Sequence, residues 1–336
     1  MRRLLIIFLV LFVFTACTQQ LDKEKTNEIN IYSARNYDVD KDLLIQFEEE
    51  SGIKVNLFEG KGDELIERLK LEKSDPIADI FVTVGAETLY PALQNELLEE
   101  LNLDSLKDTL EIGYYGDKWV ALTKRARVIV YDKLNNPNPT ILSLNDLTEP
   151  QYSGQILSRS STSSYNLALI AHQVQLNGLE NAKQLAQGLV NNFSRTPTGN
   201  DRDQAKAVLA GLGKYAIMNT YYVSAMERSS EPEEVKVAQQ IGLIYPTETH
   251  VNISWIGRIK DSPNPLNAQL LIEFLLSETS QKEYAERNGE YPALNSIPVS
   301  SLLLPWDAFS KAEINYETLG QYTIETVQLF DEVGWE

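Results

Sequence analysis

The sequence predicts an α/β protein of two lobes, each a mostly parallel sheet flanked by helices, with a ligand cleft between the lobes. Three observations support this prediction. The chain has 336 residues, more than the roughly 250 to 300 at which a single hydrophobic core stops growing. Its 43% hydrophobic and 23% charged residues are typical of a globular protein. From residue 28 onward, short apolar runs alternate with helical patterns, which indicates sheets covered by helices.

The first 17 residues have the pattern of an export signal. Arg2 and Arg3 precede an apolar run over residues 4–14, and Thr-Ala-Cys follows. The run is shorter than the roughly 20 apolar residues that a transmembrane helix needs. Cys17 is the only cysteine, and its position resembles a bacterial lipobox. We therefore expect an exported protein, periplasmic or at the cell surface, whose lipid on Cys17 anchors it to the membrane through a tether over 18–27. The alternative is an incidental cysteine in a signal peptide cut elsewhere.

The first lobe begins with strands and helices in alternation. Apolar runs and helical spacings predict strands at 29–32, 53–58 and 78–84, with helices at 40–51 and 63–73. Gly52 ends the first of these helices. The β-α-β-α-β order is typical of an open, mostly parallel sheet with helices on both faces.

A second unit of the same kind follows from residue 127. We expect strands at 128–131, 155–157 and 215–218 and helices at 165–175, 179–190 and 204–210. A strand at 251–259 and a helix at 266–276 return to the first lobe, and an amphipathic stretch at 316–333 packs on the second. The predicted lobes are thus 28–126 plus 251–298 and 127–250 plus 299–336. Their hinge lies near 124–127 and 250–252.

The charge of the chain argues against nucleic acid as a partner. The formal net charge is −18, whereas phosphate contacts require a surplus of Lys and Arg on the surface. An acidic surface suits a cationic or neutral cargo better than an anion, although net charge says little about any one pocket.

Sequence motifs of hydrolytic enzymes are missing. The chain has no Gly-x-Ser-x-Gly, no His-Glu-x-x-His and no Gly-rich phosphate loop. Ser51 and Lys54 match Ser-x-x-Lys only in isolation. With two histidines, His172 and His250, a Ser-His-Asp triad has few ways to form. We therefore expect no enzymatic activity.

Tyrosines follow several of the predicted strands. Ligands of open α/β sheets bind beyond the carboxyl ends of the strands, and Tyr37, Tyr165 and the pair Tyr221-Tyr222 occupy such positions. At the start of a helix, neighbouring side chains can both reach the open end of the sheet. The alternative is that these rings fill the core or lie on the surface, since the chain has 16 tyrosines.

Phenolate oxygen is a hard, basic donor that suits Fe(III). A highly charged cation can hold a phenol deprotonated although free tyrosine titrates near roughly pH 10. Two histidines and a single exported cysteine leave too few ligands for a zinc or copper site. No EF-hand pattern is present, which disfavours calcium.

Six motifs in order resemble the ferric-iron-binding proteins of bacterial ABC importers, over about residues 28–336. These motifs are Arg35-Asn36-Tyr37, Gly60-Lys61-Gly62-Asp63-Glu64-Leu65, Lys124-Arg125-Ala126-Arg127-Val128-Ile129, Ser163-Ser164-Tyr165-Asn166, Thr198-Gly199-Asn200-Asp201 and Asn219-Thr220-Tyr221-Tyr222. The resemblance implies the two-lobed, type II-like periplasmic-binding-protein fold. It also implies that Tyr37, Tyr165, Tyr221 and Tyr222 are the iron ligands.

Three further residues are implied to lie next to the ligands. Four phenolates around Fe(III) leave a net charge of −1, which we expect the guanidinium of Arg127 to balance. The alternative for Arg127 is a pair with a surface carboxylate. Asn36 stands where the tyrosine-rich branch often has histidine, and Glu59 matches a position where some relatives have an acidic ligand.

The resemblance implies a function in iron transport. The protein is expected to be a monomer that captures Fe(III) and hands it to an ABC transporter permease with its ATPase. Carbonate or citrate could bind with the iron as a synergistic anion, and the resemblance leaves this open. The alternative is a binding protein of the same fold for another small solute, such as a polyamine, thiamine or an oxyanion.

Overall fold

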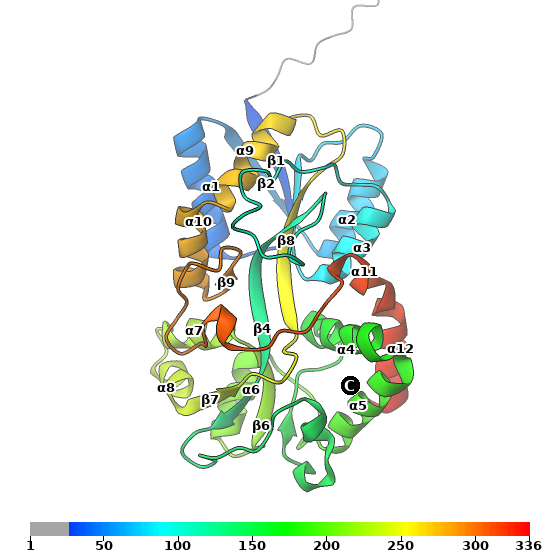
Figure 1. Ribbon diagram of the computed structural model, residues 1–336, viewed down its shortest axis with the longest axis vertical. Helices are drawn as coiled ribbons and strands as arrows, with labels where there is room; N and C mark the ends of the chain where they lie inside the picture. Colours follow the sequence, from blue (N-terminus) through cyan, green and yellow to red (C-terminus); the bar gives the residue numbers. More distant parts are fainter. Residues whose placement is uncertain (1–26) are drawn as a thin grey trace, which may run out of the picture.

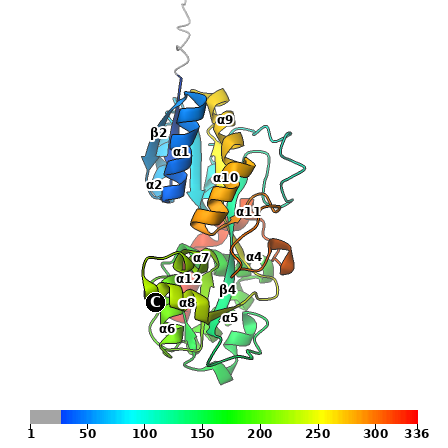
Figure 2. The ribbon, with the colours of Figure 1, turned by 90° about the vertical axis from the view of Figure 1, so that its left-hand side faces the viewer.

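The structure is a computed structural model that describes residues 27–336. The predicted export signal, Cys17 and residues 18–26 of the predicted tether lie outside the described residues. Figure 1 shows two lobes, one above the other, with two long strands running between them. The same division appears in the view turned by 90° (Figure 2). Among the residues described, no helix is long and apolar enough to cross a membrane.

The upper lobe in Figure 1 holds the first strands of the chain. The strand β1 (Glu28–Ser33) lies between β2 (Lys54–Glu59) and β3 (Ile80–Val84) and runs parallel to both. The helices of this lobe are α1 (Asp38–Ser51), α2 (Gly62–Leu71), α3 (Leu89–Gln94), α9 (Pro265–Leu275) and α10 (Glu278–Glu283). One core cluster joins the sheet to α1 and α9 and another joins it to α2 and α3, so helices cover both faces.

The lower lobe repeats this layering. The strands β5 (Ile156–Leu157) and β6 (Tyr215–Asn219) are parallel, and β7 (Ile241–Ile244) is a short further strand. The helices are α4 (Ser164–Asn177), α5 (Leu179–Asn191), α6 (Asp201–Leu209), α7 (Tyr221–Glu227), α8 (Pro232–Gln240) and α12 (Thr323–Val333). Buried apolar residues of α4, α5 and α12 form one core cluster.

The strand β4 (Val120–Asp132) belongs to both lobes. Its first part, up to Ala126, pairs with β8 (Val251–Arg258), and its second part, from Arg127, pairs with β6 and β7. The sequence predicted only 128–131 as strand, because charged residues interrupt the apolar pattern before that point. Lys124, Arg125 and Arg127 are nevertheless at most 1% exposed.

The predicted α/β fold of two lobes is confirmed, but the sheet is mixed and not mostly parallel. The chain leaves the upper lobe along β4 and returns along β8, and strands that carry a chain out and back run antiparallel. For the same reason β8 opposes β3, and β4 opposes both β6 and β7. The short β9 (Tyr291–Pro292) also pairs antiparallel with β4.

The end of the chain crosses between the lobes once more. The helix α11 (Tyr316–Leu319) packs on α3 in the upper lobe, whereas α12 packs on α4 and α5 in the lower one. The amphipathic stretch predicted at 316–333 is therefore divided by a 3₁₀ turn at Gly320–Tyr322.

Candidate functional site

Four tyrosine side chains from both lobes come together at the junction. Tyr37 immediately precedes α1, Tyr165 lies in the first turn of α4, and Tyr221 and Tyr222 begin α7. The ring centroids of Tyr37 and Tyr221 are 6.3 Å apart. The hydroxyl oxygens of Tyr165 and Tyr221 are 3.3 Å apart, and the rings of Tyr221 and Tyr222 are 4.1 Å apart. We call these four residues the tyrosine cluster.

Local hydrogen bonds fix the two turns that carry the cluster. After β1, the Ser33 hydroxyl donates to the carbonyl of Arg35 and accepts from its amide, which closes the turn before Tyr37. After β6, the Thr220 amide donates to the carbonyl of Ala126, while the Thr220 hydroxyl accepts from the Ala126 amide. The start of α7 is therefore tied to β4 at the point where β4 passes between the lobes.

The surroundings keep Tyr165 and Tyr221 protonated when no cation is present. Burial raises the pKa of Tyr165, and the neighbouring Tyr37 and Tyr222 raise it further. Burial also raises the pKa of Tyr221 well above its usual value, together with Tyr165, Tyr37 and Tyr222. Several phenolates this close together repel one another. A cation that replaces their protons removes this repulsion.

Arg125 is a residue of this site that sequence reasoning missed as a functional group. Its guanidinium lies 5.5 Å from the centroid of the Tyr221 ring and is fully buried. Its Nε donates to Glu290 at 2.7 Å and its Nη2 to Ser254, whereas its Nη1 has no hydrogen-bond partner among residues 27–336. Since residues i and i+2 of a strand point to the same face, the position of Arg127 was a signal for Arg125.

Arg127 lies next to the cluster, but its guanidinium donates its hydrogen bonds to other residues. Its Nη1 donates to Asp201 at 2.8 Å and its Nη2 to Asn166 at 2.7 Å, and its guanidinium is 5.8 Å from the centroid of the Tyr165 ring. Asp201 is buried, so Arg127 does not pair with a surface carboxylate. Arg159 also contacts the Tyr165 ring, at 5.5 Å.

Asn36 and Glu59 are engaged at the surface. The side-chain oxygen of Asn36 accepts from Lys41 at 2.8 Å, and the Lys41 ammonium lies 3.4 Å from the Glu59 carboxylate. Both residues are exposed. The two therefore share one lysine as their partner.

Other metal-binding groupings are missing from the described part of the chain. No set of three or more His, Cys, Asp or Glu side chains there is arranged to hold a metal ion. His172 and His250 form a buried pair, with their Nδ1 atoms 3.3 Å apart. Hydroxyl oxygens of the tyrosine cluster are thus the donor set that this structure offers, and they suit a hard cation.

Comparison with known proteins places the chain in a family. The family described as "Bacterial extracellular solute-binding protein" matches residues 75–312. The chain belongs to this family. Iron uptake protein A1 of Synechocystis is 35% identical to this solute-binding protein over 92% of this chain and 88% of the relative. The major ferric iron-binding protein of Neisseria meningitidis is 28% identical over 82% of this chain and 84% of the relative.

Solved structures agree with this assignment. A Trichodesmium protein in complex with iron and citrate has a TM-score of 0.84 and 39% identity, covering 92% of this chain and 100% of its own. A ferric binding protein from Campylobacter jejuni has a TM-score of 0.82 and 37% identity, with the same coverage. The predicted resemblance and the two-lobed fold of this solute-binding protein are confirmed.

Proposed function

We propose that this solute-binding protein captures ferric iron with Tyr37, Tyr165, Tyr221 and Tyr222. The observation that supports this proposal most strongly is that four phenol groups, distant in sequence, meet between the two lobes. Relatives named as iron uptake and ferric iron-binding proteins agree with the same cargo. Iron is the transported solute here and no part of a catalytic centre.

The charges of the site favour this cargo. When Fe(III) enters, three positive charges arrive and four phenolic protons leave, so the loaded site carries one negative charge more than the empty one. The buried guanidinium of Arg125 stabilises that negative charge. The guanidinium of Arg159, which lies beside Tyr165, stabilises it further. Because ligands must lose protons, iron affinity falls as the pH drops.

The proposed mechanism is closure of one lobe on the other. We assign residues 28–126 plus 251–298 to one lobe and 127–250 plus 299–336 to the other, with α11 of the second range reaching across to pack on α3 of the first. Iron first meets Tyr165, Tyr221 and Tyr222, and Tyr37 completes the site as the lobes close, as in the hinge closure of periplasmic binding proteins. The closed form is then recognised by an ABC transporter permease with its ATPase.

The proposal also covers location and accessory groups. The protein is exported, acts as a monomer and is held to the membrane by a lipid on Cys17. Citrate is a suitable companion anion, since the similar Trichodesmium protein holds iron and citrate. Carbonate is an alternative.

An oxyanion is the second candidate cargo. The free Nη1 of Arg125 and the nearby Arg159 are suited to bind negatively charged oxygens. The same two arginines disfavour a cationic amine such as a polyamine or thiamine.

Titration of the purified protein with ferric and ferrous iron, followed by visible absorption and metal analysis, tests the proposal. We expect stoichiometric ferric binding and a reddish phenolate-to-iron charge-transfer band. A protein that stays colourless and retains no iron would refute the proposal, and binding of phosphate in its place would support the oxyanion.

A further inference from the structure

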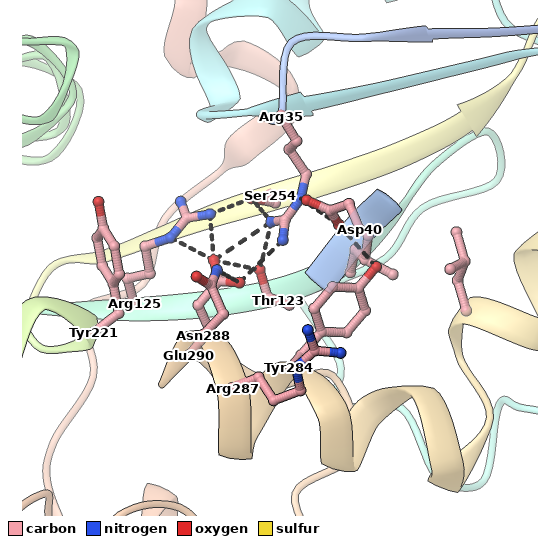
Figure 3. A network of polar contacts seen from close by, with 12 residues as sticks. Arg35, Asp40, Thr123, Arg125, Tyr221, Ser254, Tyr284, Arg287, Asn288 and Glu290 are labelled. Atoms are coloured by element: carbon pink, nitrogen blue, oxygen red, sulfur yellow. Dashed lines mark hydrogen bonds and ion pairs between the residues drawn. The ribbon is translucent and has the colours of Figure 1, made fainter. Parts of the chain in front are cut away.

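A buried carboxylate, Glu290, joins two arginines that face the tyrosine cluster. Figure 3 shows Glu290 between the guanidinium groups of Arg35 and Arg125. It accepts hydrogen bonds from Arg35 Nη2 at 3.0 Å, Arg125 Nε at 2.7 Å, the Thr123 hydroxyl at 2.9 Å and Asn288 Nδ2 at 2.7 Å. Glu290 is 0% exposed.

The two arginines that Glu290 joins each face a tyrosine of the cluster. The Arg35 guanidinium lies 5.0 Å from the centroid of the Tyr37 ring, and that of Arg125 lies 5.5 Å from the Tyr221 ring. Tyr37 belongs to the upper lobe and Tyr221 to the lower one. The Glu290 carboxylate therefore holds both guanidinium groups, one facing a tyrosine of each lobe.

The ionised state of Glu290 fits this arrangement. Burial alone raises the pKa of a carboxyl group, but Arg125 and Arg35 outweigh burial and bring the pKa of Glu290 down to about 2. Two guanidinium groups buried side by side without a carboxylate between them would repel each other. Glu290 thus allows Arg35 and Arg125 to share one small volume.

The hydrogen bonds of Arg125 leave one nitrogen of its guanidinium, Nη1, without a partner among residues 27–336. Glu290 engages its Nε, and Ser254 on β8 engages its Nη2. Nη1 is also buried. Burying a charged donor without a partner costs free energy, so a negatively charged group beside this atom would be stabilised by it.

We propose that Glu290 is a positioning residue of the cargo site, which holds the guanidinium of Arg125 in place so that its charge stabilises the loaded tyrosine cluster. This inference rests on the proposed function. Glu290 itself touches neither the tyrosines nor the cargo in this assignment, and it acts through Arg125. Arg35 is held by the same carboxylate and also by Asp40, at 3.1 Å from its Nε, so it depends less on Glu290.

Glu290→Gln tests the proposal, because it keeps the shape of the side chain but removes its charge and one acceptor. We expect the ferric affinity to fall by roughly 10- to 100-fold, the effect typical of residues that orient metal ligands. The charge-transfer band should also shift, since the electrostatic surroundings of the phenolates change. Unchanged affinity together with an unchanged band would overturn the proposal.

A double-mutant cycle with Arg125→Met shows whether Glu290 acts through Arg125. If it does, Glu290→Gln has little additional effect on ferric affinity in the Arg125→Met background, so the two losses are not additive. If the two losses add in full, Glu290 acts by another route and the proposal is wrong.

Two further variants separate this role from a loss of folding. Asp79→Asn is the matched control, since Asp79 is also a fully buried carboxylate but accepts from Asn30 and Asn264 in the upper lobe. We expect it to lower thermal stability and to leave the band in place. If Glu290→Gln does not fold, Glu290→Asp keeps the charge and withdraws it by one methylene, and a wild-type band and affinity in that variant would overturn the proposal. Failure of the wild-type protein to bind iron would instead refute the proposed function.

Discussion

Individual hydroxyl groups decide what this site can bind. Tyr221 and Tyr222 follow one another at the start of α7, and their rings are close enough to face the same cation. Tyr165 reaches the same place from α4. The rings alone would form an ordinary aromatic cluster, whereas their hydroxyl oxygens are the donors that the proposed ferric site requires.

Removing single hydroxyls therefore separates a metal site from a packing cluster. Tyr221→Phe or Tyr222→Phe should lower ferric affinity by more than about 100-fold, beyond the usual effect of residues that only orient ligands, and should weaken the charge-transfer band. Tyr215→Phe is the matched control. Tyr215 begins β6, the strand that leads to α7, and its hydroxyl accepts a hydrogen bond from Asn136 away from the cluster. Ferric affinity that is unchanged in both cluster variants would contradict tyrosine ligation.

The buried histidine pair predicts a dependence of stability on pH. Burial lowers the pKa of His172 to about 4 and that of His250 well below its usual value, the latter also because His172 and Arg127 lie close. Both values lie below those of the unfolded chain, so the unfolded chain binds the protons more readily. The free energy of unfolding is therefore highest above about pH 6.5. It decreases as the pH falls towards 4, by roughly 3 kcal/mol for His172.

Urea unfolding at several pH values measures this effect. The free energy of unfolding of the wild-type protein should decrease between pH 6.5 and 4, and His172→Gln should make that decrease shallower. Equal slopes for the two proteins would show that His172 does not carry the effect.

At the level of elements, apolar periodicity predicted most of the fold. The strands β1, β2, β3, β6 and β8 and the helices α1, α2, α4, α5, α6 and α9 were all predicted within a few residues of their bounds. The first half of β4 was not, because Lys124 and Arg125 look like surface residues in the sequence. Their burial depends on Glu290, Asn295 and other partners that are distant along the chain.

The same limit applies to the site. The tyrosine positions followed from the ends of strands, which is a local rule, and the structure brings all four together. Glu290 had no local signal, since it precedes the short β9 and meets its arginines only through long-range packing. The helix α8 and the strand β7 were also missed.

The helix α6 supplies a prediction about capping. Asn200 accepts from the amides of Arg202 and Asp203, and the Asp203 side chain accepts from the Asn200 amide, which forms a capping box. Asn200→Ala should lower the free energy of unfolding by about 1 kcal/mol. For a chain of this size the melting temperature should fall by about 2 °C, measured by calorimetry, and an unchanged melting temperature would contradict the role of the cap.

On the scale of the whole molecule, the tyrosine cluster draws its side chains from both lobes. Tyr37 and Arg35 stand on the upper lobe, whereas Tyr165, Tyr221 and Tyr222 stand on the lower one. The lobes are joined by β4, β8 and the segment before α12 (Figures 1 and 2). Cargo that bridges the lobes therefore favours the closed arrangement.

Small-angle X-ray scattering tests this coupling. We expect the radius of gyration to decrease when ferric iron is added, because the ion draws Tyr37 towards the other ligands. Tyr37→Phe should reduce that change. An identical radius for the iron-free and iron-loaded protein would show that iron does not drive closure.

The most direct measurement is a crystal structure of the iron-loaded protein with the metal located by anomalous scattering. The account predicts one ferric ion in direct contact with the hydroxyl oxygens of Tyr37, Tyr165, Tyr221 and Tyr222, above the guanidinium of Arg125. An ion bound elsewhere, or one that leaves Tyr165 and the Tyr221-Tyr222 pair without contact, would contradict it.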